Sequence, residues 1–294
     1  MKVGIIGLGR MGTAISLRLH EQGFSVIGWD HSAAANRAAA GTGLAIADHP
    51  RDAAAQSDFI ISSITEDNGA RQIFAGPDGF LRGDITGKLF IEMSTLQPMT
   101  GRELAQQVET RGGHLIDAPV LGTIPQARAG TLFAMVGGRS EEVELARPVL
   151  GKLARRIVHL GPHGSGHAMK LAANVGLGTY IAALSESLAL GARYGLTVEQ
   201  MLEVLQESAT ACSWLKNKAE VLKGATADMT LDIATLRKDI MSAVATGALA
   251  GVPMPVASGT LAALSAAVKG EYGNSDIAEL PRFFREAMLQ SFGR

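Results

Sequence analysis

The sequence predicts an α/β protein with a doubly wound, mostly parallel sheet in its first part and an all-helical second part. Up to about residue 162, short apolar strand segments alternate with helical segments, which is typical of a sheet covered by helices on both faces. After Gly166 the pattern is helical throughout, and one long apolar helix joins the two parts. A chain of 294 residues suits two domains. We expect them at residues 1–162 and 163–294.

The first strand, residues 2–6, runs directly into a glycine-rich turn and then a helix over residues 13–22. The turn reads Gly7, Leu8, Gly9, Arg10, Met11 and Gly12. In this G-x-G-x-x-G pattern the first glycine allows the tight turn and the second lets backbone N–H groups meet a pyrophosphate. The third glycine packs the helix on the strand, and the helix N-terminus favours negative charge. The sequence therefore predicts a Rossmann-type domain that binds a dinucleotide.

Asp30 ends the second strand, 18 residues after Gly12. A carboxylate at this distance accepts both ribose hydroxyls of NAD and repels the 2'-phosphate of NADP. We therefore expect NAD, with NADP as the alternative because His31, Ser32 and Arg37 could solvate a phosphate. An ordinary aspartate in a strand-end turn is the other interpretation of Asp30.

Further cofactor contacts are expected where later strands end, because ligands of doubly wound sheets bind outside the carboxyl ends of strands. The strand over residues 59–64 ends at Ser63 and Ile64, and the strand over residues 88–93 leads to Thr95. These three residues are candidate cofactor ligands.

The composition argues against several other classes of protein. A net charge of −1 lacks the basic excess of a nucleic-acid-binding protein. The single cysteine, Cys212, rules out a disulfide framework and fits a reducing cytoplasm. Residues 240–268 carry no charge, but Pro253 and Pro255 interrupt them, so we expect two buried helices of small residues and no membrane span.

The helix that opens near Ala168 carries one charge, Lys170, up to Ser185. A helix that is apolar all round is expected to be buried all round. Lys170 then either reaches out to solvent near the helix end or is held inside a cavity. Asn174 lies four residues on and therefore on the same helix face.

Four stretches in this order carry a family resemblance: GLGRMG at 7–12, DAPVLG at 117–122, GSGHAMKLAAN at 164–174 and RKD at 237–239. Together they resemble the β-hydroxyacid dehydrogenase family, which includes 3-hydroxyisobutyrate dehydrogenase, tartronate semialdehyde reductase and 6-phosphogluconate dehydrogenase. The resemblance implies an NAD(P)-dependent oxidoreductase. Its substrate would be a small β-hydroxy acid, similar to 3-hydroxyisobutyrate, or the corresponding semialdehyde. It also implies a homodimer or homotetramer.

The resemblance also implies roles for individual residues. Lys170 matches the catalytic lysine, the general acid/base, and Asn174 matches the asparagine that orients the substrate. Thr95 matches a residue beside the nicotinamide and the substrate. Lys238 matches a lysine on the cofactor side of the cleft, and Asp239 is its neighbour on the substrate side.

This sequence departs from the family at the substrate. Leu121, Gly122 and Thr123 stand where the family usually has Ser-Gly-Gly, whose hydroxyl and backbone amides hold the substrate carboxylate. Leu121 has no hydroxyl and Thr123 adds bulk, so we expect a larger or less polar substrate. Arg128 is a candidate replacement contact, although a solvated loop arginine is the simpler interpretation. Trp214 either lines the pocket or packs in the helical core.

Other functions have weaker support. His159, His163 and His167 recur every four residues, but Pro162 and the glycines around it break a helix, so we expect no metal. An imine reductase-like enzyme on the same fold is an alternative, although imine reductases typically lack the lysine found here at 170. The other alternative is a dinucleotide-binding assembly or sensor protein without turnover, which would need neither Lys170 nor Asn174.

Overall fold

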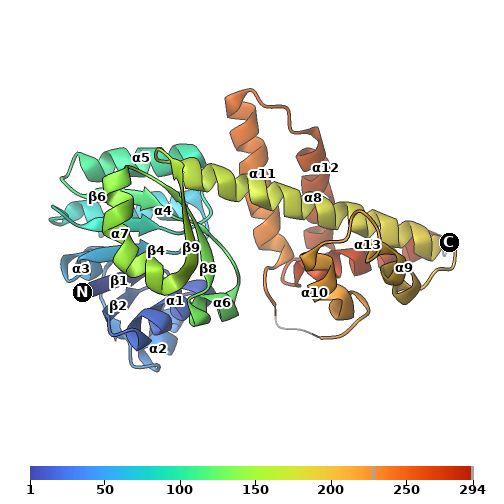
Figure 1. The fold of residues 1–294 in the computed structure, drawn as a ribbon, viewed down its shortest axis with the longest axis horizontal. Helices are drawn as coiled ribbons and strands as arrows, with labels where there is room; N and C mark the ends of the chain where they lie inside the picture. The colour runs from blue at the N-terminus through green and yellow to red at the C-terminus, as the bar shows by residue number, and fades with distance from the viewer. Residues whose placement is uncertain (227–228, 293–294) are drawn as a thin grey trace. The chain divides into compact units, whose positions relative to one another are not determined.

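The computed structural model describes residues 1–226 and 229–292, and they form two compact units (Figure 1). The first unit spans Met1–Leu171 and the second spans Ala172–Arg294. The helix α8 (Ser165–Arg193) runs from the first unit into the second. The predicted domain boundary after residue 162 therefore stays a prediction.

The described strands of the first unit form one nine-stranded sheet in the order β3-β2-β1-β4-β5-β6-β8-β7, with β9 paired to β8. The pairings from β3 to β6 are parallel, β8 is antiparallel to β6 and β7, and β9 is parallel to β8. This is the predicted mostly parallel sheet. The bounds are β1 (Lys2–Ile6), β2 (Ser25–Trp29), β3 (Ala45–Ile46), β4 (Phe59–Ser62), β5 (Leu89–Glu92), β6 (His114–Asp117), β7 (Val120–Leu121), β8 (Leu132–Gly137) and β9 (Ala154–Gly161).

Successive residues of the central strands face opposite cores, as the period of two in a strand requires. On β1, Ile5 packs into one core and Ile6 into the other. Helices whose apolar residues join the first core are α1 (Arg10–Glu21), α2 (Ala33–Ala40), α6 (Ile124–Ala129) and α7 (Ser140–Leu153). Those of the second core are α3 (Pro50–Ala55), α4 (Asp67–Ala75), η1 (Phe80–Arg82) and α5 (Pro98–Glu109).

The described regular elements of the second unit are all helices, apart from one isolated bridge between Asp232 and Asp276. Its helices after α8 are α9 (Val198–Leu205), α10 (Ser213–Leu222), α11 (Ile233–Ala250), α12 (Pro255–Ala267), η2 (Val268–Tyr272), η3 (Ile277–Glu279) and α13 (Leu280–Phe292). The helices α11 and α12 are the predicted pair of small-residue helices, but they are not buried throughout as expected, since Leu249 is 77% exposed and Val256 is 63% exposed. Gly251, at φ 69°, ends α11 in the left-handed conformation that glycine adopts without strain.

One expectation about α8 is wrong within the single chain. This helix is long and apolar enough to cross a membrane, but only 28% of its most apolar 18-residue window is buried. Met169 is 42% exposed and Leu190 is 64% exposed. The sequence pattern shows that α8 avoids charge, but it cannot show how many neighbouring helices one chain supplies to cover it.

Candidate active site

The glycine turn between β1 and α1 has the shape that a dinucleotide needs. Gly7 lies at φ 93°, and a Cβ there would lie 2.2 Å from the carbonyl oxygen of Ser63. A Cβ at Gly12 would lie 1.8 Å from the carbonyl oxygen of Gly7, so the turn, α1 and β4 pack without room for side chains. A Cβ at Gly9 would meet no atom within 4 Å. The backbone at Gly9 is therefore open at the N-terminus of α1, where a pyrophosphate is stabilised.

A cavity of about 690 Å³ opens beside this turn, within the size range of ligand sites. Six predicted cofactor residues line it: Gly7, Gly9, Asp30, His31, Ser63 and Ile64. Trp29, His49, Gln72 and Asp78 also line it, although no sequence motif marks them. The other predicted cofactor residues are not among the described residues that line the cavity: Leu8, Arg10, Met11, Gly12, Thr95 and Lys238. Leu8 instead packs against Gly28, and Met11 packs on the core.

The carboxylate of Asp30 is held in place by backbone donors. Leu8 N–H donates to Oδ2 over 2.7 Å, and Ser32 N–H donates to Oδ1 over 2.8 Å. His31 Nδ1 lies 3.0 Å from Oδ1. A carboxylate has about four lone-pair sites, so Asp30 keeps acceptor capacity on the cavity side for ribose hydroxyls. Its location and its bonding both fit a dinucleotide.

Lys170 lies in the second turn of α8, and its Nζ donates to the carbonyl oxygen of Val120 over 2.9 Å. The start of α8 is anchored by the buried Asp117, which ends β6. Its Oδ1 accepts from Gly164 N–H over 2.8 Å and its Oδ2 accepts from His167 N–H over 3.0 Å. A carboxylate at a helix N-terminus satisfies orphan donors and favours the helix dipole. The sheet therefore fixes the position from which Lys170 extends.

The departures from the family pattern begin at Leu121, the last residue of β7, and continue in the residues that follow it. Leu121 is 39% exposed. The Thr123 N–H donates to Gln126 Oε1 over 2.9 Å, and the Thr123 hydroxyl bonds to the same oxygen. Both polar groups of Thr123 therefore cap α6. Arg128 pairs with Glu21 on α1. Its contact with a substrate carboxylate stays a prediction.

Three predicted site residues of the second unit form a compact group. Asn174 Nδ2 donates to Asp239 Oδ2 over 2.7 Å, and Lys238 Nζ lies 2.7 Å from Asp239 Oδ1. Asn174 and Asp239 are both buried. Trp214 packs edge-on against Tyr180 in the helical core, with ring centroids 6.1 Å apart. Its predicted contact with substrate stays a prediction.

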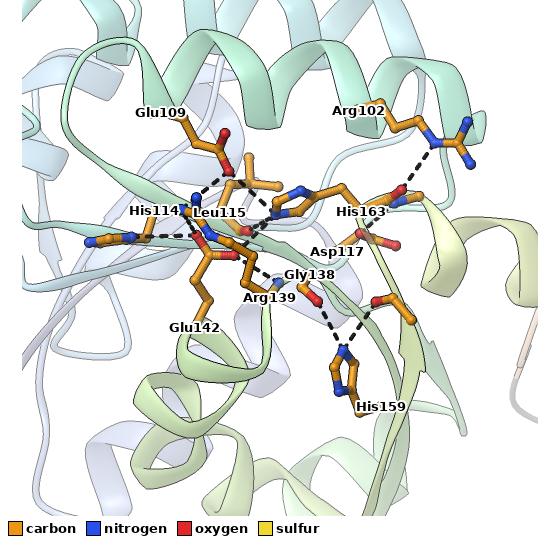
Figure 2. A network of polar contacts seen from close by, with 12 residues as sticks. Arg102, Glu109, His114, Leu115, Asp117, Gly138, Arg139, Glu142, His159 and His163 are labelled. Carbon is orange, nitrogen blue, oxygen red and sulfur yellow. Dashed lines mark hydrogen bonds and ion pairs between the residues drawn. The ribbon is translucent and has the colours of Figure 1, made fainter.

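A second polar cluster surrounds His163, two residues before the start of α8 (Figure 2). Glu109, Glu142 and His163 place potential metal-ligand atoms within 4.8 Å of one another. However, Arg139 Nη2 donates to Glu142 Oε1 over 2.7 Å and lies 3.3 Å from Glu109 Oε1. His163 Nε2 lies 2.8 Å from the Leu115 carbonyl oxygen, so it carries a proton. Protein partners already occupy these atoms, and we assign the cluster a structural role.

The dinucleotide cavity and the lysine helix together define the class of protein as an oxidoreductase that uses a nicotinamide cofactor. Residues 2–161 match the NAD binding domain of 6-phosphogluconate dehydrogenase. Residues 164–284 match the domain described as NAD-binding of NADP-dependent 3-hydroxyisobutyrate dehydrogenase. The chain belongs to the β-hydroxyacid dehydrogenase family.

Individual relatives agree with this placement. The chain is 32% identical to 2-(hydroxymethyl)glutarate dehydrogenase of Eubacterium barkeri over 259 residues, which is 87% of this chain and 85% of that enzyme. The structure of Mycobacterium tuberculosis 3-hydroxyisobutyrate dehydrogenase with L-serine superposes with a TM-score of 0.84 at 27% identity, covering 97% of this chain and 99% of that one.

Imine reductases share the fold at a greater distance. An imine reductase variant from Myxococcus stipitatus, in complex with NAD+, has a TM-score of 0.63 at 23% identity, covering 96% of this chain and 98% of that one. This likeness shows the fold alone.

Proposed function

We propose that this protein transfers hydride between the nicotinamide and a β-hydroxy acid, or the corresponding semialdehyde, with Lys170 as the general acid/base. The observation that carries the proposal is the placement of Lys170 against the Val120 carbonyl, at the start of the loop over residues 121–123. The two related enzymes support the substrate class, because 2-(hydroxymethyl)glutarate and 3-hydroxyisobutyrate both carry a hydroxymethyl group beside a carboxylate.

The protein's own part in the reaction is positioning and proton transfer. When bound, the nicotinamide supplies or accepts the hydride. Lys170 Nζ takes the proton of the substrate hydroxyl during oxidation and returns it during reduction. Asn174, held by Asp239, orients the substrate oxygen. Lys238 and Thr95 take their places on the cofactor side, as the family pattern implies.

For the cofactor we propose NAD over NADP. The support is the Asp30 carboxylate at the cavity wall, whose negative charge repels a 2'-phosphate. The exposed His31 beside it is the residue that would lessen this preference, because its ring is a potential hydrogen-bond donor to a 2'-phosphate.

For assembly we propose a homodimer, or a homotetramer built from such dimers, in which a second copy covers the exposed apolar side of the second unit. Leu190 and Tyr194 at the end of α8 and Leu249 at the end of α11 are large exposed side chains of this unit. Burial of such groups typically stabilises an assembly. The single Cys212 supports a cytoplasmic location, and the proposed partners are small molecules, not nucleic acid or membrane.

Absorbance at 340 nm tests the reaction directly. The purified protein is incubated with NAD or NADP and a panel containing 3-hydroxyisobutyrate, serine, glycerate, phenylserine and 4-hydroxybutyrate. Reduction of the cofactor by at least one member supports the proposal. Cofactor binding without turnover on this panel and on cyclic imines would instead favour a binding protein, and turnover of imines alone would favour an imine reductase.

A further inference from the structure

Glu92 is a carboxyl group in the interior of the first unit that the proposed mechanism does not use. It is the last residue of β5, it is fully buried, and it lies level with Ser62 on β4 and Asp117 on β6. The Ser62 hydroxyl donates to Glu92 Oε2, and the Ser94 N–H donates to Oε1 over 2.9 Å. The Ser94 hydroxyl is also hydrogen-bonded to this carboxyl group. A buried carboxylate with several donors is well satisfied when it is ionised.

These serines connect Glu92 to the wall of the cofactor cavity. The Ser94 hydroxyl oxygen accepts from Ile64 N–H over 2.9 Å. Ile64 and its neighbour Ser63 line the cavity. The Ser63 carbonyl in turn occupies the place that a side chain at Gly7 would need. A continuous set of contacts therefore runs from Glu92 through Ser62 and Ser94 to the glycine turn.

The two protonation states of Glu92 have different consequences for these contacts. As an acceptor, the carboxylate receives the Ser94 hydroxyl proton and leaves the lone pairs of that oxygen for Ile64 N–H. When protonated, the carboxyl must itself donate to a serine oxygen, and on Ser94 it competes with Ile64 N–H. Burial raises the pKa of Glu92 to about 7, against the hydrogen bonds from Ser62 and Ser94. Both states are therefore populated near neutral pH.

The neighbouring titratable groups do not replace Glu92 in its contacts with Ser62 and Ser94. Asp117 on β6 adds negative charge, and its two oxygens are already bonded to the start of α8. His167 on α8 is fully buried, and burial lowers its pKa, which keeps it neutral. Asp67 on α4 accepts from Gln97 N–H over 2.9 Å. Among these groups, Glu92 alone contacts both serines that support the cavity wall.

We propose that Glu92 is a positioning residue for the cofactor, whose ionised form holds the Ser63–Ile64 wall in its binding position, so that cofactor binding expels a proton from Glu92. The inference rests on nicotinamide cofactor binding in the cavity and is independent of which substrate the enzyme uses. If the ionised form binds tenfold more tightly, linkage requires that the pKa of Glu92 falls by about one unit on binding.

Binding of NAD+ to the full-length protein, measured by titration calorimetry from pH 5.5 to 8.5, tests the proposal. NAD+ itself has no group that titrates in this interval. The dissociation constant is expected to rise about tenfold as the pH falls, since one hydrogen bond to a charged group is worth roughly this much. His31 and His49 also line the cavity, and positive charge on either would strengthen pyrophosphate binding, which is an effect of the opposite sign.

Variants assign this response to Glu92. The affinity of Glu92→Gln for NAD+ should depend little on pH. Glu92→Asp keeps a carboxyl group and should therefore restore part of the pH dependence. Glu103→Gln, an outer glutamate of α5 that pairs with Arg71, should keep the wild-type profile. If Glu92→Gln does not fold, proton release by the wild-type protein on NAD+ binding still tests the proposal. Calorimetry in two buffers of different ionisation enthalpy should show release of about half a proton between pH 6 and 7. A flat wild-type profile without proton release, or a Glu92→Gln variant that keeps the response, overturns the proposal.

Discussion

The ammonium group of Lys170 and the carbonyl oxygen of Val120 form a hydrogen bond of 2.9 Å that joins α8 to β7. The bond brings the proposed general acid/base beside the loop in which this chain departs from its family. Proton transfer and substrate selection are therefore expected to be separable by mutation, because Lys170 lies on α8 and Leu121 lies on β7.

Lys170→Ala should reduce kcat/KM by roughly 10²–10⁴-fold, the usual contribution of a positioned acid/base. The dissociation constant for NAD+ should change little, because Lys170 is not among the residues that line the cofactor cavity. Steady-state rates at 340 nm and calorimetric NAD+ binding measure the two effects. Lys216→Ala, at an exposed position of α10, is the matched control. Near-normal turnover in Lys170→Ala would remove the lysine from the mechanism.

Leu121→Ser should shift selectivity toward substrates with a carboxylate. The change adds a hydroxyl donor where the wild-type chain offers an exposed apolar side chain. A hydrogen bond to a charged group predicts a gain of roughly tenfold in kcat/KM for a β-hydroxy acid relative to its methyl ester. The ratio of the two kcat/KM values for each variant is the measurement. An unchanged ratio would show that the carboxylate is bound elsewhere.

Asp30→Ala should weaken NAD+ binding by tenfold or more and raise the ratio of NADP+ to NAD+ affinity. The change removes the ribose acceptor and also leaves the N–H groups of Leu8 and Ser32 without their carboxylate. Asp30→Asn keeps one acceptor oxygen, so its affinity for NAD+ should lie between those of the wild type and Asp30→Ala. Calorimetry with both cofactors gives the constants. A wild-type preference for NADP+ would contradict the assignment of Asp30.

The cluster of Figure 2 should make folding stability depend on pH through His163 and Glu142. A hydrogen bond to Glu142 raises the pKa of His163 above 6.5, against the effect of burial. Its stabilisation is therefore full below pH 6.5 and is lost as the pH rises through the raised pKa. Burial alone would raise the pKa of Glu142, but hydrogen bonds from His163 and Arg139 outweigh it and lower the pKa from 4.5 to about 2. The stabilisation that ionised Glu142 contributes is therefore present above pH 4.5 and is lost as the pH falls toward 2.

His163→Gln tests this pH dependence. The difference in unfolding free energy between wild type and variant should be largest between about pH 4.5 and 6.5 and should shrink by pH 8.5. Chemical denaturation at each pH measures it. His159→Gln is the control, because the hydrogen-bond partners of His159 in the described part of the chain are the Gly138 and Gly161 carbonyls. Equal pH profiles for the two variants would contradict the role of the His163–Glu142 pair.

Sequence alone was sufficient for features whose residues are close in the chain. The turn from Gly7 to Gly12 is a local geometry, because its glycines are required by the contacts of one strand with the next helix. The single charge of Lys170 and its spacing from Asn174 follow from helix periodicity. The strand β9 is not indicated by the sequence, because its exposed charged residues hide the strand pattern.

Tertiary structure decided which residues from distant segments meet. Glu92 and Ser62 are 30 residues apart, and only the register of β4 with β5 brings their side chains together. Arg128 resembles a loop residue in the sequence, yet the packing of α6 on α1 places it beside Glu21. The physical reason is general. Periodicity along one chain segment determines which face a side chain takes, whereas the partner on that face depends on how separate segments pack.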